Sequence, residues 1–166
     1  MTETPTAAAQ AWLASLDGAL QRRDVDAALD LFEDESYWRD FVAFTWNLKT
    51  LEGKADIRRM LQATLGHVQP ANWALAEDAT GSTGAGGTVE AWITFETGAA
   101  RGYGHLRLRS GKCWTLLTTM QELKGFEEKK GPRREQGVAH QIVRGRRSWK
   151  ELKEEQEARL GYEEQP

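Results

Sequence analysis

The stretch that decides the fold is FEDESYWRDFVAFTWNLKTLEGKADIRRML, residues 32–61. It begins at the end of one helical pattern and ends inside another. Aromatic residues crowd its middle, and one acid, Asp40, lies among them. Aromatic neighbours remove water from a carboxylate, and this loss of solvation makes it a stronger base. The alternative is structural: Asp40 is a surface acid at a strand end, and the aromatic side chains form an ordinary core.

Helical periodicity flanks this stretch on both sides. Apolar residues recur every three or four positions in residues 6–22, which predicts an amphipathic helix. A short second helix is predicted after Asp24, with Phe32 on its apolar face. A third helix is predicted over residues 55–65, ended by Gly66. The first two helices form a tight hairpin that must bury one face.

The sequence pattern changes from a period of 3.6 to a period of 2 after this third helix. Alternation of apolar and polar residues is longest in residues 88–97. Strands are predicted over residues 36–44, 73–77, 88–97, 103–109 and 113–123, with turns between them. Helices followed by a long antiparallel meander indicate an α+β domain.

Length and charge indicate one small domain with a charged tail. The chain has 166 residues and 40% hydrophobic residues, enough for one core. We expect a domain over residues 1–123 and a charged linker over 124–166, with a helix at 149–160 that starts with a capping box. The net charge of −3 argues against nucleic-acid binding.

Several classes of protein are not indicated by the sequence. Cys113 is the only cysteine, so no disulfide within the chain is expected. The histidines and this cysteine show no metal-ligand spacing, so we expect no metal. No signal peptide and no membrane-spanning apolar run are visible, and we expect a cytoplasmic protein without a membrane partner.

The stretch also carries a family resemblance. The motif LxGxxxIRxxL at residues 51–61, after the helix hairpin and the aromatic strand, is similar to the NTF2-like or SnoaL-like superfamily. This group includes ketosteroid isomerases, polyketide cyclases and non-catalytic binding domains. The resemblance implies an NTF2-like cone, in which N-terminal helices pack on a strongly curved antiparallel or mixed sheet. It also implies a homodimer formed through the sheets.

Two longer motifs resemble a narrower group. YWRDFVAFTWNLKTLEG (37–53) and GHLRLRSGKCWTLLTTMQELKGFEEKKGPRRE (104–135) are similar to the N-terminal domain of bacterial flavin-dependent monooxygenase-like proteins. There this domain precedes an FAD domain, which this chain lacks. The resemblance implies an FAD-binding domain in cis, to which FAD and NADPH would belong. We therefore expect no cofactor in this chain and no redox chemistry by this chain alone.

The resemblance to ketosteroid isomerases offers a catalytic alternative. Asp40 falls at the position of their catalytic base, but Leu16 lies near the position of their oxyanion-hole tyrosine. Without donors aimed at the developing enolate, proton abstraction loses its largest electrostatic contribution. The alternative function is an isomerase or cyclase with Asp40 as general base. His105 is its candidate partner across a pocket.

Our main hypothesis is a domain that binds a small apolar molecule. Asp40 and His105 are its candidate catalytic or polar groups. A third alternative is a non-catalytic dimerisation module whose cavity is filled by its own side chains. The candidate ligand-binding residues are all aromatic: Tyr37, Trp38, Phe41, Phe44, Trp46, Trp92 and Trp114.

Overall fold

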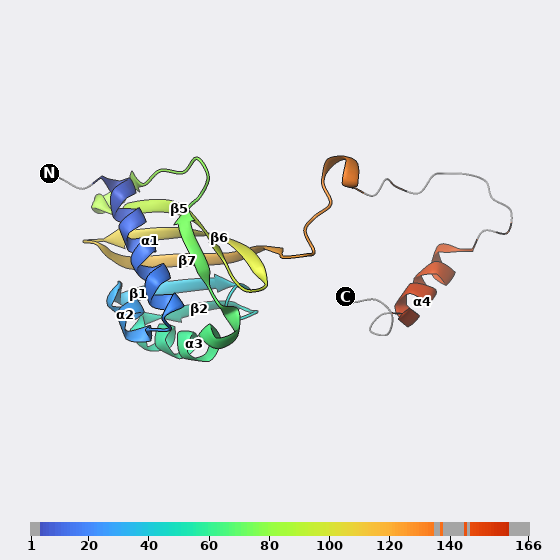
Figure 1. Cartoon of the computed structure of the whole chain (residues 1–166), viewed down its shortest axis with the longest axis horizontal. Coiled ribbons are helices and arrows are strands. Elements are labelled where there is room, and N and C mark those ends of the chain that lie inside the picture. The colour runs from blue at the N-terminus through green and yellow to red at the C-terminus, as the bar shows by residue number, and fades with distance from the viewer. Residues whose placement is uncertain (1–3, 135–136, 138–144, 146, 160–166) are drawn as a thin grey trace. The chain divides into compact units, whose positions relative to one another are not determined.

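The computed structural model describes residues 4–134, 137, 145 and 147–159. The chain divides into two compact units, Met1–Glu128 and Lys129–Pro166. The first unit holds three helices on one side of a sheet (Figure 1). Within the residues described, the helices are too short or too polar to cross a membrane.

Side-chain caps begin the first two of the three helices in the first unit. Helix α1 (Pro5–Gln21) is capped by Thr4, whose Oγ1 accepts a hydrogen bond from the Ala7 N–H at 3.2 Å. Helix α2 (Val25–Asp30) is capped by Asp24 in the same way. Helix α3 runs over Gly53–Val68 and ends at Gln69, whose φ of 50° is left-handed.

The sheet is mixed and has seven strands. Its order is β2-β1-β7-β6-β5-β3, with β4 paired to β5. All pairs are antiparallel except β1 with β7, which is parallel and joins the N-terminal and C-terminal parts of the sheet. The strands are β1 (Phe32–Phe41), β2 (Leu48–Glu52), β3 (Ala71–Leu75), β4 (Ser82–Thr83), β5 (Val89–Glu96), β6 (Ala100–Arg109) and β7 (Lys112–Leu123); a 3-10 turn, η1 (Ala85–Gly87), precedes β5.

The structure confirms the α+β NTF2-like fold and corrects three details. Phe32 begins β1 and is not part of the second helix, and β1 ends at Phe41 rather than Phe44. Gly66 lies inside α3, so it does not end the helix. The meander of β3, β5, β6 and β7 is antiparallel as predicted, and the parallel pairing of β1 with β7 makes the sheet mixed. Local patterns miss that last pairing, since it joins segments far apart in the chain.

The strand register sorts the side chains into two faces. One row crosses the sheet through Asp40, Thr118, Gly104 and Ile93, and its residues are buried beneath the helices. The neighbouring row passes through Arg39, Leu117, His105 and Trp92. Successive residues of a strand point to opposite faces, so the second row lies on the face away from the helices. We call this second face the open face.

The interior between helices and sheet is filled by aromatic side chains. The rings of Trp73 and Phe95 stack with centroids 4.6 Å apart, and Phe44 contacts Trp38 edge to face at 5.0 Å. Trp38 also stacks on Phe32 at 5.7 Å. Contacts of this kind add about 0.5–1.5 kcal/mol per pair beyond the area they bury. Two of the aromatic residues singled out in the sequence, Trp38 and Phe44, are therefore part of the core.

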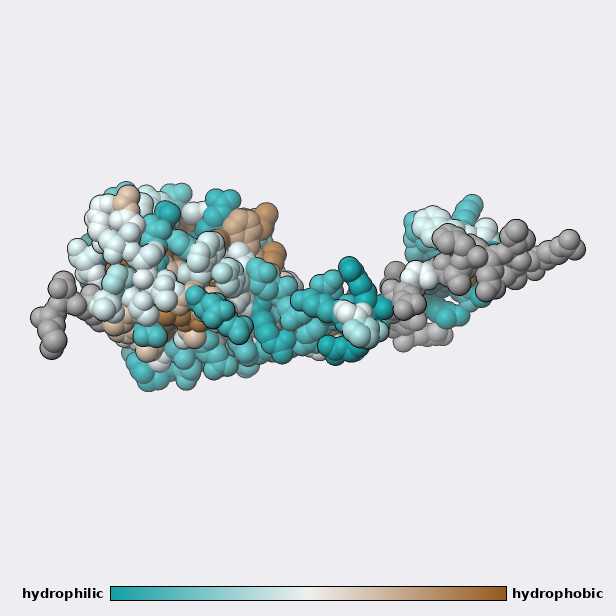
Figure 2. Space-filling model, turned by 90° about the horizontal axis from the view of Figure 1, so that it is seen from above, coloured by the Kyte–Doolittle hydropathy of each residue, from teal (hydrophilic) through white to brown (hydrophobic). Residues whose placement is uncertain are grey.

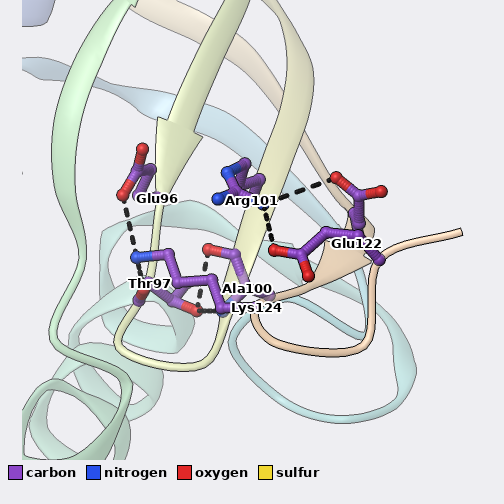
Figure 3. Close-up of polar contacts among 7 residues, drawn as sticks. Glu96, Thr97, Ala100, Arg101, Glu122 and Lys124 are labelled. Carbon is purple, nitrogen blue, oxygen red and sulfur yellow. Dashed lines mark hydrogen bonds and ion pairs between the residues drawn. The ribbon is translucent and has the colours of Figure 1, made fainter. Parts of the chain in front are cut away.

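Ion pairs hold the end of β7 against the β5–β6 hairpin (Figure 3). The Lys124 Nζ lies 2.8 Å from Glu96 Oε2 and donates a hydrogen bond to the Thr97 carbonyl at 2.7 Å. Arg101 contacts Glu122 at 3.4 Å and Glu127 at 2.8 Å. The hydrogen bond from Arg101 lowers the pKa of Glu127 to about 2. These contacts fix where the chain leaves the first unit.

The second unit contributes the turn η2 (Gly131–Arg133) and helix α4 (Trp149–Arg159). The Glu151 carboxylate accepts hydrogen bonds from the N–H and the hydroxyl of Ser148, as a capping box does. Leu160, the last residue of the predicted helix, lies outside the described residues. No described residue of α4 is buried, and in Figure 2 the described surface of this unit is mostly teal and white.

Candidate functional site

The Asp40 carboxylate closes the turn between β1 and β2. Asp40 is fully buried, and its Oδ2 accepts hydrogen bonds from the Thr45 N–H and Oγ1, both at 2.8 Å. The Phe44 N–H is shared between the two carboxylate oxygens at 3.1 and 3.2 Å. Oδ1 also accepts a hydrogen bond from the Thr118 hydroxyl at 2.8 Å. The oxygen of this Thr118 hydroxyl in turn accepts a hydrogen bond from Trp38 Nε1 at 2.9 Å. We call this network the Asp40 clasp.

The clasp occupies both oxygens of the candidate base. Each oxygen of Asp40 already accepts at least two hydrogen bonds. His105 lies in the neighbouring row of the sheet, on the open face, whereas Asp40 lies on the helix face. The sheet therefore separates the two residues. This geometry favours a structural role for Asp40.

The turn that the clasp holds contains strained backbone. Val42 and Trp46 have φ values of 55° and 52°, in the left-handed region that side chains rarely adopt. Each such residue costs about 1–3 kcal/mol and persists only where its surroundings impose it. The Val42 N–H also donates to the Asn47 carbonyl at 3.0 Å. The turn is thus a fixed loop, and Trp46 is held at its surface, 59% exposed.

A pocket formed by several strands lies on the open face. Its volume is about 730 Å³, and we call it the open-face pocket. Trp92 is 48% exposed there, stacks on Tyr103 with centroids 5.4 Å apart and meets His105 edge to face at 4.5 Å. The residues that define the pocket come from β1, β2, β5, β6 and β7, and include Tyr37, Arg39, Trp92, His105, Arg107 and Leu117.

The charges around this pocket are partly compensated. The Arg107 Nε lies 3.2 Å from Glu90 Oε1. Burial and the neighbouring Arg107 together lower the pKa of His105 below its ordinary value of 6.5, and Glu90 opposes this shift. The imidazole is therefore neutral at pH 7 and above. The aromatic floor of the pocket then carries no charge.

This shift predicts a small dependence of stability on pH. Between the lowered pKa of His105 and 6.5, the unfolded chain binds a proton that the folded chain does not. The free energy of unfolding should therefore fall as the pH decreases through this window. His105→Asn should remove this contribution. Urea unfolding of the wild type and the variant from pH 5 to 8 checks this prediction. Subtracting one free energy of unfolding from the other removes the contributions of the other titrating groups. An identical pH profile in the two proteins would contradict the assignment.

A second pocket, of about 480 Å³, lies between the turn after β1 and helix α3. We call it the α3 pocket. Trp46 and Lys49 stand on the side of the turn and β2, and Asp56 and Arg59 form an ion pair on the side of α3. The residues that define it include Phe44, Trp46, Lys49, Arg59, Met60 and His67.

The structure does not gather the predicted aromatic residues into one site. Trp38 is wholly in the core, and Phe44 is buried but also forms part of the α3 pocket. Phe41 lies under Arg39 on the open face, with the guanidinium carbon 5.2 Å from the ring centroid. Trp114 lies in a smaller pocket beneath Arg109. Tyr37, Trp92 and His105 do come together, in the open-face pocket.

Sequence reasoning missed three groups at these sites. Tyr103 stacks on Trp92 and lies two residues before His105, so the alternation of the strand could have revealed it. Thr118 completes the Asp40 clasp from 78 residues away, and no local pattern points to it. Lys49 and Arg59 flank the α3 pocket from separate elements and looked like ordinary surface charges.

The described residues offer no arrangement that suits metal binding or thiol chemistry. No cluster of three or more His, Cys, Asp or Glu side chains that could hold a metal occurs within them. Cys113 is buried, and this burial raises the pKa of its thiol well above the ordinary value. A buried thiol of this kind is a poor nucleophile at neutral pH.

Solved structures with this arrangement show the same fold at low sequence identity. A domain of unknown function with a cystatin-like fold from Nostoc punctiforme PCC 73102 is 14% identical, with a TM-score of 0.58 over 73% of this chain and 80% of that chain. The orange carotenoid protein of Anabaena (Nostoc) sp. PCC 7120, solved with canthaxanthin, is 15% identical with a TM-score of 0.55. The match covers 67% of this chain but only 36% of that protein.

A computationally designed 17-OHP binder is also similar, at 15% identity and a TM-score of 0.52 over 72% of this chain and 90% of that chain. No curated protein matches this chain in sequence. The model of the SnoaL-like domain family matches residues 10–116, from within α1 to within β7. The chain belongs to the SnoaL-like domain family.

Proposed function

We propose that this domain binds a small, flat, apolar molecule in the open-face pocket. The observation that carries the proposal is Trp92, whose indole is 48% exposed on the floor of a concave surface of about 730 Å³. A volume in the range of about 300–1,000 Å³ is usual for small-molecule sites. A half-exposed tryptophan offers a broad apolar surface that a flat ligand covers by stacking.

The surroundings of Trp92 suit an apolar guest with little formal charge. Tyr103 and His105 contact its ring on two sides and fix its orientation. The neutral imidazole of His105 adds no charge to this floor, and Arg107 is compensated by Glu90. Arg39 at the rim leaves room for one polar substituent on the ligand. The polar and charged side chains around this floor, among them Glu90 and Arg107, would fix the orientation of the ligand.

Two structural neighbours lend the proposal limited support. One binds canthaxanthin and the other is a designed binder of 17-OHP, so proteins that contain this fold are able to hold a small molecule. In this chain, however, aromatic rings fill the space between helices and sheet. The proposal therefore places the ligand on the open face and derives that location from this chain alone.

Trp92→Ala tests this proposal with 1-naphthylmethanol as the probe, measured by isothermal titration calorimetry. Loss of the stacking surface should weaken binding about tenfold, which corresponds to about 1.4 kcal/mol. Trp149→Ala is the matched control, because Trp149 is an exposed indole that lines neither the open-face pocket nor the α3 pocket. Unchanged affinity in Trp92→Ala, or no saturable binding to the wild type, would overturn the proposal.

Self-association of the chain is a second candidate function of the open face. Trp92 and Leu48, 48% and 63% exposed, leave apolar area uncovered on a sheet face that no helix of the first unit covers. The predicted homodimer would bury this area. Native mass measurement across protein concentrations distinguishes self-association from ligand binding. A wild-type dimer that dissociates in Trp92→Ala would assign the open face to a second copy of the chain.

The association with flavin-dependent monooxygenase-like proteins stays a prediction. It rests on the motifs at residues 37–53 and 104–135. Much of the first motif forms the Asp40 clasp and its turn, and the second forms β6, β7 and the segment held by Lys124 and Arg101. Motifs that build the domain and its exit are consistent with a module that precedes another domain.

A further inference from the structure

The α3 pocket combines an apolar floor with cationic side chains. Its floor is formed by Phe44, Leu51 and Met60, all of which are buried. Lys49 on β2 and Arg59 on α3 reach it from opposite sides. An apolar base with charge at the margin is the arrangement that an amphipathic ligand requires. This pocket lies on the helix side of the sheet, apart from the open-face pocket.

The charges at this pocket leave one cation without compensation. Asp56 forms an ion pair with Arg59, which removes one positive charge from the balance. Asp40 is the register partner of Lys49, but its oxygens are held by the clasp and no ion pair joins the two. Within the described part of the chain, Lys49 makes no ion pair. Its ammonium group is therefore available to an anion.

The wall beside Lys49 is held in place before any ligand binds. The Asp40 clasp fixes the turn that carries Phe44, Thr45 and Trp46. The Trp46 indole is 59% exposed and borders the pocket. Because the turn is already ordered, a ligand that covers Trp46 does not have to order this loop, and preorganisation of this kind raises affinity.

We propose that the α3 pocket is a second binding site that takes an organic carboxylate with a flat apolar body. The carboxylate pairs with Lys49, with His67 as a further hydrogen-bond donor, while the body covers Trp46 and contacts Met60. A volume of about 480 Å³ accommodates a bicyclic aromatic acid. In the open-face pocket, by contrast, the Arg39 guanidinium lies over the Phe41 ring and Arg107 is paired with Glu90.

The test uses 1-naphthoate and its uncharged counterpart 1-naphthylmethanol in isothermal titration calorimetry on the full chain. Lys49→Gln should weaken naphthoate binding about tenfold, because a hydrogen bond to a charged group contributes about 1.5–3 kcal/mol. Trp46→Ala should cause a loss of similar size. Lys112→Gln removes an exposed lysine outside both pockets and should leave binding unchanged.

Other outcomes would overturn the inference. They are equal naphthoate affinity in Lys49→Gln and the wild type, or no saturable binding of naphthoate. Loss of naphthoate binding in Trp92→Ala rather than Trp46→Ala would place the acid in the open-face pocket instead. The proposed function fails separately, since it is judged on 1-naphthylmethanol and Trp92. Circular dichroism of each variant confirms that the fold is retained.

Discussion

Asp40→Ala is expected to lower the free energy of unfolding by about 3–5 kcal/mol, because it leaves buried hydrogen-bond donors without an acceptor. Those donors are the Phe44 and Thr45 N–H groups and the Thr118 hydroxyl. The backbone donors cannot rotate away, and the strained turn at Val42 and Trp46 loses its anchor. Urea denaturation followed by tryptophan fluorescence measures the change.

Asp40→Asn separates the structural role from a catalytic one. An amide keeps one acceptor oxygen and offers the other side of the clasp an N–H group, so the expected loss is smaller, about 1–3 kcal/mol. Asp30→Asn is the matched control, since Asp30 is exposed, and it should change stability by less than about 0.5 kcal/mol. Full stability in Asp40→Asn together with loss of a measured isomerase or cyclase turnover would restore Asp40 as a general base.

The contrast between local and distant contacts explains which parts of the fold were predictable. Strand β5 was predicted within one residue at each end, because its alternation reflects one buried and one open face. Helix α1 was predicted equally well from its apolar stripe. In both elements, the apolar or polar character of each residue follows from the face on which it lies. The boundaries can therefore be predicted without knowing which elements pack nearby.

The end of β1 was not predictable in that way. Its aromatic residues continue to Phe44, and β-propensity alone extends the strand that far. The strand stops at Phe41 because Asp40 takes the N–H groups of Phe44 and Thr45, and Thr118 supports the carboxylate from β7. Propensity describes a segment by itself, whereas this boundary is set by a contact across the sheet.

The candidate site was predictable only as a set of residue types. Several aromatic residues lie near Asp40 in the sequence, but the sequence does not say which of them share a face. Trp38 and Tyr37 are adjacent in the chain, yet the first lies in the core and the second in the open-face pocket. Tyr37, Trp92 and His105 meet because β1, β7, β6 and β5 are neighbours in that order.

Gly104→Ala is expected to lower the free energy of unfolding by about 3 kcal/mol, because overpacking against a rigid neighbour is costly. A Cβ at this position would overlap the Leu117 carbonyl oxygen of β7 and lie 3.2 Å from Ile93 Cγ1. A backbone carbonyl within a sheet cannot rotate away, so β6 would have to move from β7. Gly104 is the register partner of Thr118, so the displacement would also reach the Asp40 clasp.

Gly66→Ala makes the same chemical change where space is open. Gly66 lies in α3, and a Cβ there would meet nothing within 4 Å. Alanine should therefore raise the free energy of unfolding by about 0.5–1 kcal/mol through its higher helix propensity. Urea unfolding of the two variants should thus shift in opposite directions. If Gly104→Ala is as stable as the wild type, then β6 and β7 do not approach closely at this point, and the row that connects Asp40, Thr118 and Gly104 is not a rigid part of the sheet.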